Sequence, residues 1–139
     1  MIKIILYWLW QLSWGFIQTA AGFIMFLLCS LSGENHSFYK GAVVTGWKKP
    51  TSASIGPFLF LSESLRGASY DRMLAHEYGH SLQSLILGPL YLFAVGVPSF
   101  IWCNLPYFQR IRKTKGKSYY SVYPENWADR LGKINNSGR

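Results

Sequence analysis

The stretch Leu74-Ala75-His76-Glu77-Tyr78-Gly79-His80-Ser81-Leu82 decides how this chain is built. On a helix, a spacing of four residues places His76 and His80 on one face, about 6 Å apart along the axis. Two imidazole nitrogens so arranged can bind one metal ion at about 2.0 to 2.1 Å. Glu77 is rotated off that face, so it can act as a general base on a water without being a ligand. Gly79 is costly in a helix, which indicates close approach of another element.

A third ligand is needed, because catalytic zinc sites use three protein ligands and leave the fourth position open. The chain has three histidines, and the remaining one, His36, lies in a polar, turn-like stretch typical of a solvated loop. Two solvated histidines on an ordinary helix are the alternative for the motif itself. With so few His and acidic residues in the chain, a chance H-E-x-x-H is improbable.

A better candidate for the third ligand lies downstream in residues 123–132. Pro124 can open a helix there and Gly132 can close it, which leaves Glu125 and Asp129 one turn apart on a shared face. Glu125 would bind the metal, and Asp129 would accept a hydrogen bond from a ligand histidine and fix its ring. The alternative is a first helical turn whose acids favour the helix dipole.

These two motifs together resemble those of the gluzincin metallopeptidases, the thermolysin-like clan. The resemblance consists of H-E-x-G-H on one helix and Glu-x-x-Ala-Asp on a later one, and covers 76–82 and 123–132. It implies one Zn²⁺ per chain, held by His76, His80 and Glu125, with Glu77 as base and Asp129 supporting a ligand histidine. More loosely, the apolar remainder is similar to small membrane-embedded zinc peptidases of bacteria.

The expected function is hydrolysis of peptide bonds by zinc-activated water, with Glu77 taking the water proton and passing it to the leaving amine. The developing oxyanion needs a further donor. Tyr119, Tyr120 and Tyr123, shortly before Glu125, are candidates. The alternative is a non-catalytic membrane scaffold or binding protein with a structural or vestigial zinc site, against which the intact Glu77 argues.

Composition indicates one domain at a membrane. The 139 residues are 50% hydrophobic and 17% aromatic, which is high for a soluble protein of this size. Ile4–Leu31 carries no charge and is long enough to span a bilayer, so 1–33 is predicted to be an N-terminal transmembrane helix. A signal peptide or a buried core helix are the alternatives. Cys29 and Cys103 lie in apolar runs and are expected to be buried thiols.

Residues 39–61 predict a β-hairpin or small sheet before the motif helix. Gly41–Thr45 and Ile55–Leu61 are the strand-like runs, separated by a segment with turn residues. In gluzincins the preceding strand aligns the substrate, so by resemblance the candidate aligning residues are Ser54, Ile55, Gly56 and Phe58. A purely structural hairpin is the alternative. Ser69 is the expected N-cap, with Asp71 in the first turn.

The apolar run Leu82–Leu105 sets a topological condition. A straight helix across a bilayer would separate the histidines from Glu125, so the chain must return to the side it left. Gly88-Pro89 supplies a break. We therefore predict a catalytic helix over 70–87 and an apolar returning arm over 89–105, with a compact water-soluble hairpin on the sheet as the alternative.

The predicted fold is a mainly α membrane protein with a small β-hairpin or sheet, in which 34–139 forms a minimal metallopeptidase domain. All basic residues but Lys3 lie in 32–139, which by the positive-inside rule places the active site on the cytoplasmic side of a bacterial inner membrane. The expected partners are a peptide or protein substrate and anionic lipids, not nucleic acid. The lipid contacts would be Arg110, Arg112, Lys113, Lys115 and Lys117, for which an ordinary solvated basic turn is the alternative.

Overall fold

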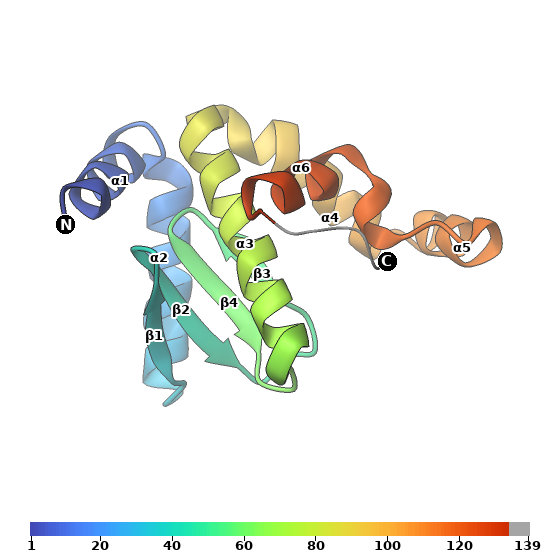
Figure 1. Cartoon of the computed structure of the whole chain (residues 1–139), viewed down its shortest axis with the longest axis horizontal. Helices are drawn as coiled ribbons and strands as arrows, with labels where there is room; N and C mark the ends of the chain where they lie inside the picture. Colours follow the sequence, from blue (N-terminus) through green and yellow to red (C-terminus); the bar gives the residue numbers. More distant parts are fainter. Residues whose placement is uncertain (134–139) are drawn as a thin grey trace.

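The structure is a computed structural model that describes residues 1–133. It is mainly helical with a small mixed sheet, which confirms the coarse fold prediction (Figure 1). Residues 134–139 of the predicted metallopeptidase domain lie outside the described part. The elements in chain order are α1 (Ile2–Ser13), α2 (Phe16–Leu31), β1 (His36–Tyr39), β2 (Ala42–Trp47), β3 (Ala53–Ile55), β4 (Phe58–Ser62), α3 (Gly67–Leu87), η1 (Gly88–Leu90), η2 (Leu92–Gly96), α4 (Val97–Asn104), α5 (Pro106–Lys115), η3 (Tyr119–Ser121) and α6 (Tyr123–Leu131).

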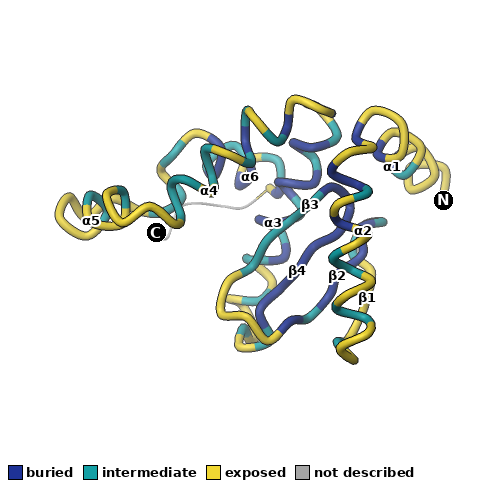
Figure 2. The backbone as a smooth tube through the Cα atoms, turned by 180° about the vertical axis from the view of Figure 1, so that it is seen from behind, coloured by how far each residue is buried: buried dark blue, intermediate teal, exposed yellow. Residues whose placement is uncertain are grey.

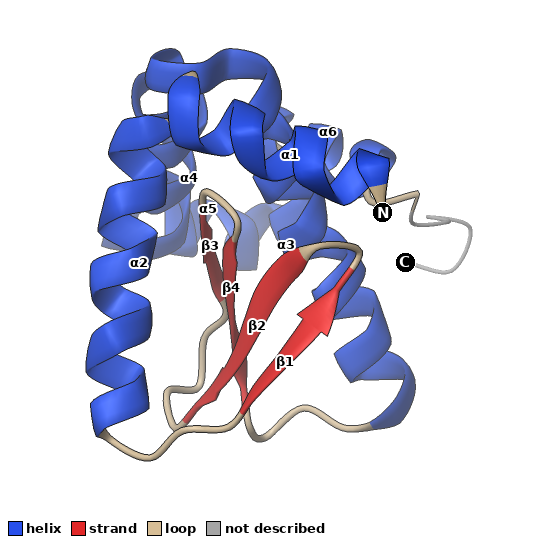
Figure 3. Cartoon of the chain, turned by 90° about the vertical axis from the view of Figure 1, so that its left-hand side faces the viewer, coloured by secondary structure: helices blue, strands red, loops and turns tan. Residues whose placement is uncertain are grey.

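The sheet lies between two helices, with α2 on one face and α3 on the other (Figure 3). Strands β2 and β4 are buried on both faces, so their alternate side chains supply two cores. Val44, Leu59 and Leu61 pack toward Leu74 of α3. On the opposite face, the core members are Val43, Trp47, Phe58 and Phe60, with Met25, Phe26 and Cys29 of α2 against them. The core therefore fixes α3 relative to the sheet.

The strand order is β1-β2-β4-β3, with β2 and β4 parallel and both outer pairs antiparallel. The expected single strand over Ile55–Leu61 is wrong. Gly56 has φ +59° and forms a two-residue turn with Pro57, as a type II′ hairpin needs, so the run divides into β3 and β4. Residues 48–52 consequently connect β2 to β3, which are not neighbours in the sheet, and do not form a hairpin turn. His36 lies in β1 and not in a loop.

The expected continuous helix over Ile4–Leu31 is also wrong. It divides at Trp14-Gly15 into α1 and α2, whose axes are bent by 101°. Gln11 and Thr19 explain the bend, because the Thr19 hydroxyl donates to the Gln11 carbonyl oxygen across the break at 2.8 Å. In the described part of the chain no one helix has both the length and the apolar character for a bilayer crossing, and only this bent pair reaches them jointly.

Polar side chains on the inner faces of α1 and α2 bind α3. Tyr7 is hydrogen-bonded to Ser81, and the Gln18 amide donates to Ser84 Oγ at 3.0 Å and to the Gly88 carbonyl oxygen at 2.8 Å. The outward faces carry large exposed hydrophobic side chains instead. These helices therefore meet α3 through polar side chains and carry apolar side chains on their outward faces.

Helix α3 begins at Gly67, three residues before the predicted start, so Ser69 is not its N-cap. Arg66 occupies that position in an extended conformation, and its guanidinium donates to the carbonyl oxygens of Glu63 and Leu65. The helix ends at Gly88, whose φ of +53° is accessible to glycine, as the Gly88-Pro89 break predicts. The chain then continues through η1, η2 and α4, and Ser99 of α4 contacts Glu125 of α6.

The basic cluster is helical and not a turn. It forms α5, which ends at Gly116 in the left-handed conformation and extends away from the sheet (Figure 1). Cys29 and Cys103 are free and half-buried. The predicted third-ligand helix is α6, with Pro124 in its first turn and Gly132 directly after it.

Candidate metal centre

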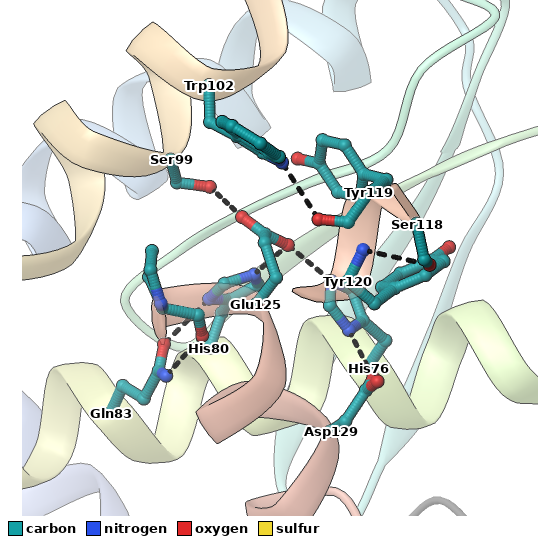
Figure 4. Close-up of polar contacts among 11 residues, drawn as sticks. His76, His80, Gln83, Ser99, Trp102, Ser118, Tyr119, Tyr120, Glu125 and Asp129 are labelled. Atoms are coloured by element: carbon teal, nitrogen blue, oxygen red, sulfur yellow. Dashed lines mark hydrogen bonds and ion pairs between the residues drawn. The ribbon is translucent and has the colours of Figure 1, made fainter. Parts of the chain in front are cut away.

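Three side chains from two helices converge at one buried point. His76 and His80 project from the same face of α3, and Glu125 comes from the first turn of α6 (Figure 4). Glu125 Oε2 lies 3.0 Å from His76 Nε2 and 3.4 Å from His80 Nε2. One ligand atom from each residue can be chosen so that all lie within 4.8 Å of one another. The predicted set of three therefore can hold a metal ion.

The outer nitrogens of both imidazoles are held by acceptors. His76 Nδ1 lies 2.7 Å from Asp129 Oδ1, and His80 Nδ1 lies 2.7 Å from Gln83 Oε1. The Gln83 amide nitrogen donates to the Pro124 carbonyl oxygen at 2.8 Å, which turns its oxygen toward the ring. With Nδ1 donating to these acceptors, each neutral ring would direct the lone pair of Nε2 toward a metal ion, whereas a protonated ring would donate from Nε2 to the Glu125 carboxylate.

Such a donor set fits a metal ion. Two nitrogen lone pairs and a carboxylate oxygen, all buried, repel one another unless a metal ion or a proton lies among them. The pKa values show the same demand for positive charge. Burial alone would lower the pKa of His76, but hydrogen bonds to Asp129 and Glu125 raise it to about 9. Burial would raise the pKa of Glu125, yet hydrogen bonds to both histidines hold it well below its usual range.

The neutral histidine, carboxylate and tight geometry match the ligands zinc prefers, although the same donors also suit other divalent transition metals. The two histidine ligands limit the candidate ions to transition metals that bind imidazole, of which zinc is one.

Close contact between α3 and α6 brings the ligands together. A Cβ at Gly79 would overlap the Ala128 carbonyl oxygen, and one at Gly132 would overlap the Ala75 carbonyl oxygen. The backbones can approach only because these positions lack side chains. The close approach predicted at Gly79 is thus confirmed, and its partner is the helix that carries Glu125.

Two residues that hold the ligands were not predicted. Gln83 follows His80 by three residues on the same helical face, a spacing that could have identified it. Ser99, on α4, donates a hydrogen bond to Glu125 Oε1 and leaves Oε2 to face the histidines. No local pattern identifies Ser99, since it reaches Glu125 only because the arm folds back.

The Glu77 side chain is buried beside the ligands, and its carboxylate accepts no hydrogen bond from the described residues 1–133. Burial raises the pKa of its carboxyl group, and the nearby His80 and His76 oppose that rise. A carboxylate with a raised pKa and free oxygens is suited to accept and return a proton.

The three tyrosines predicted as oxyanion donors lie in different surroundings. The Tyr120 ring packs edge-on against His76 with centroids 5.0 Å apart. Tyr119 is hydrogen-bonded to Ser99, and its burial near Glu125 raises its pKa. Tyr123 is exposed and stacks on Trp127, so it is not brought to the ligands. Tyr91 was not predicted as part of the site. Its burial raises the pKa of its hydroxyl group, and the nearby negative charges of Glu77 and Glu125 raise this pKa further.

The predicted substrate-aligning residues lie on different elements. Ser54 and Ile55 belong to β3, an edge strand of the sheet, whereas Gly56 lies in the turn and Phe58 is buried in β4. Ser54 Oγ is buried without a hydrogen-bond partner among the described residues. His36 is remote from the ligands, with its ring nitrogens at 2.9 Å from Ser30 Oγ and 3.0 Å from Thr45 Oγ1.

Comparison with protein-family models, with curated proteins and with solved structures found no match.

Proposed function

We propose that this chain is a zinc-dependent peptidase that hydrolyses peptide bonds in peptides or proteins. The observation that carries the proposal is the convergence of His76, His80 and Glu125 beside the buried Glu77 carboxylate, whose oxygens have no hydrogen-bond donor among residues 1–133. A purely structural metal site has no use for such a carboxylate. Hydrolysis needs one, because water must lose a proton as it attacks the carbonyl.

Each residue would have a distinct task in this reaction. His76, His80 and Glu125 would hold the ion, and Asp129 and Gln83 would fix the two rings in the orientation that exposes Nε2. When bound, zinc supplies Lewis acidity that polarises a carbonyl and lowers the pKa of water toward about 7. Glu77 would receive the proton from water and deliver it to the leaving amine.

A groove that includes Tyr120 in its wall is the candidate route for a substrate, although none of the three ligands lines it. It has a volume of about 290 Å³ and is lined by Leu65, Ser69, Arg72, Met73, Ser118 and Tyr120. Tyr120 forms part of its wall and also contacts the His76 ring. Tyr120 is therefore the better-placed of the three candidate donors for a reacting group in this groove, and Tyr119 lies closer to Glu125.

A scaffold or binding protein with a closed zinc site is the second candidate, and the burial of the ligands favours it. His76, His80 and Glu125 are all buried, and Ser99 already occupies one oxygen of Glu125. An open zinc position would bind a hydroxamate inhibitor, whereas a closed site would not.

The decisive experiment replaces the proposed base. Glu77→Gln is expected to retain zinc, because Glu77 is not a ligand, and to lose cleavage of a casein or peptide-library substrate. Glu34→Gln, a change of the same chemistry away from the site, should leave both properties intact. Peptides trapped by the Glu77→Gln protein would then identify the substrate class.

Two results would contradict the proposal. One is cleavage by the Glu77→Gln protein at the parent rate. The other is full zinc content in the parent protein with neither peptide cleavage nor hydroxamate binding, which would establish the scaffold function instead.

A further inference from the structure

The arm that follows α3 carries an exposed apolar stripe. Its members recur at intervals of four and three residues, the spacing that keeps side chains on one helical face. They are Leu90, Phe93, Val97 and Phe100, with exposed fractions of 62%, 76%, 49% and 68%, and Ile86 at the end of α3, before the break at Gly88, is 53% exposed. Such a continuous stripe differs from the singly scattered apolar residues of a soluble surface and indicates a binding face.

The inner face of the arm fixes how the stripe is oriented. Tyr91 and Val95 are buried, Ser99 donates to Glu125, and the Trp102 indole donates to the Tyr119 carbonyl oxygen at 2.8 Å. The arm therefore cannot turn its apolar side inward without losing the contacts that hold the third ligand. The stripe therefore remains on the outer face of the arm, because the inner face makes the contacts with Glu125 and Tyr119.

The order of residues along the arm matches a path from acyl chains to head groups. Residues 78–109 contain no Asp, Glu, Lys or Arg. Tyr107, which is exposed, follows the stripe, and a basic run begins three residues later at Arg110. Aromatic residues prefer the membrane interface, and basic residues just beyond it bind anionic lipids.

Four of the basic side chains of this run are exposed, namely Arg110, Lys113, Lys115 and Lys117. Arg112 is not among them. Its guanidinium donates to the Trp102 carbonyl oxygen and lies over the Trp102 ring, 5.2 Å from the centroid. Arg112 thus joins α5 to the arm, and the backbone views show α5 continuing from α4 at one end of the molecule (Figures 1 and 2).

The length of the arm limits how it meets a bilayer. The apolar helical stretch Leu92–Asn104 is about 20 Å long at 1.5 Å per residue, against about 30 Å for the hydrocarbon core. It can lie within one leaflet but cannot cross. A second copy of the chain fits less well, because a symmetric contact through the stripe would bring two basic α5 helices together.

We propose that the stripe on Leu90–Phe100 lies in the acyl region of one leaflet, with α5 on anionic head groups. The outer face of the arm would then anchor the protein in one leaflet, while Ser99 on its inner face donates a hydrogen bond to Glu125. The proposal does not depend on peptidase activity.

Fluorescent probes at single positions of the full-length chain test it. In a background with Cys29→Ser and Cys103→Ser, the variants Phe93→Cys and Phe100→Cys would carry an NBD label. Phe38→Cys is the matched control, because Phe38 is also a phenylalanine, 79% exposed, but lies on strand β1. Each protein is reconstituted in vesicles of phosphatidylcholine and phosphatidylglycerol, and nitroxide-labelled acyl chains serve as quencher.

At positions 93 and 100 we expect blue-shifted NBD emission and quenching of most of this emission by the nitroxide-labelled acyl chains. At position 38 we expect little quenching. A label at Thr114→Cys on α5 should be quenched by a head-group nitroxide, less so without phosphatidylglycerol. Because the probes lie on the arm, the result is independent of how α1 and α2 are anchored.

Equal quenching at 38, 93 and 100 would overturn the proposal, as would no quenching at 93 and 100. A blue shift at 93 and 100 that grows with protein concentration but is not quenched by lipid nitroxides would mean that a second copy covers the stripe, and would overturn it too. Quenching at Thr114 that does not respond to phosphatidylglycerol would remove the head-group part.

Discussion

Asp129 and Gln83 hold the two histidine rings by their outer nitrogens, so the metal affinity depends on residues that do not touch the metal. Loss of such a partner typically weakens metal binding by about 10- to 100-fold. We expect Asp129→Ala to lower zinc affinity by that order, because His76 Nδ1 loses its acceptor at 2.7 Å. The measurement is competition against a fluorescent zinc chelator. Asp71 is an exposed aspartate on α3, the helix that carries His76. Asp71→Ala is therefore the control and should bind zinc like the parent. Equal affinity in the two variants would exclude Asp129 as a support for His76.

Ser99 acts on the third ligand in the same indirect way. Its hydroxyl donates to Glu125 Oε1, and a hydrogen bond to a charged group contributes about 1.5 to 3 kcal/mol. Ser99→Ala should therefore weaken zinc binding by about tenfold or more. Ser13→Ala removes a hydroxyl that bonds only to its own helix and serves as control in the same chelator titration. If Ser99→Ala binds zinc as tightly as Ser13→Ala, the arm does not brace Glu125.

The ligands could be predicted from the sequence because their geometry is local. The i, i+4 spacing brings His76 and His80 together on one helix, and the same spacing relates Glu125 to Asp129. Ser99 and Tyr91 could not, because their distance from the site in sequence is closed only by the returning arm. The exposed position of Tyr123 likewise follows from the start of α6, where its ring stacks on Trp127.

At the scale of elements, the contact between α3 and α6 decides whether three ligands can meet. Gly79→Ala would place a Cβ on the Ala128 carbonyl oxygen, a backbone atom that cannot rotate away. Overpacking of this kind costs about 1 to 3 kcal/mol, and here it would also push Glu125 away from the histidines. We expect lower unfolding free energy in urea together with weaker zinc binding.

Gly96→Ala is the matched control for Gly79→Ala. The nearest atoms to a Cβ at Gly96 lie at 3.8 Å, an ordinary contact, and alanine favours helix over glycine by up to about 1 kcal/mol. The unfolding free energy of this variant should be unchanged or higher. Comparable destabilisation by both substitutions would show that the helix contact at Gly79 is not special.

The two elements that were predicted wrongly share a physical cause. In Ile4–Leu31, composition alone indicated one apolar helix, but Gln11, Gln18 and Thr19 are the residues that bond to α3 or across the break. In Ile55–Leu61, hydrophobicity continues through Gly56-Pro57, although a positive φ at Gly56 makes a turn. Both errors arose where tertiary contacts or a turn conformation override a uniform apolar pattern.

For the whole molecule, a metal ion would join helix α3 to helix α6, since two ligands come from α3 and one comes from α6. A ligand that binds only the folded state stabilises it by about 2.7 kcal/mol when present at 100 times its dissociation constant. Removal of zinc by a chelator should therefore lower the unfolding temperature, and added zinc should restore it. Without the ion, no metal ligation links the Nε2 atoms of His76 and His80 to the Glu125 carboxylate.

The variant Glu125→Gln separates this effect from general metal binding. Its neutral amide is a far poorer zinc ligand but has nearly the same shape, so it should unfold at one temperature with or without zinc. Differential scanning fluorimetry in detergent measures both proteins. A zinc-dependent shift of equal size in the parent and in Glu125→Gln would mean that the ion binds elsewhere. A shift confined to the parent would show that closure of α6 onto α3 and metal binding are one event, because Glu125 reaches the histidines only through that helix contact.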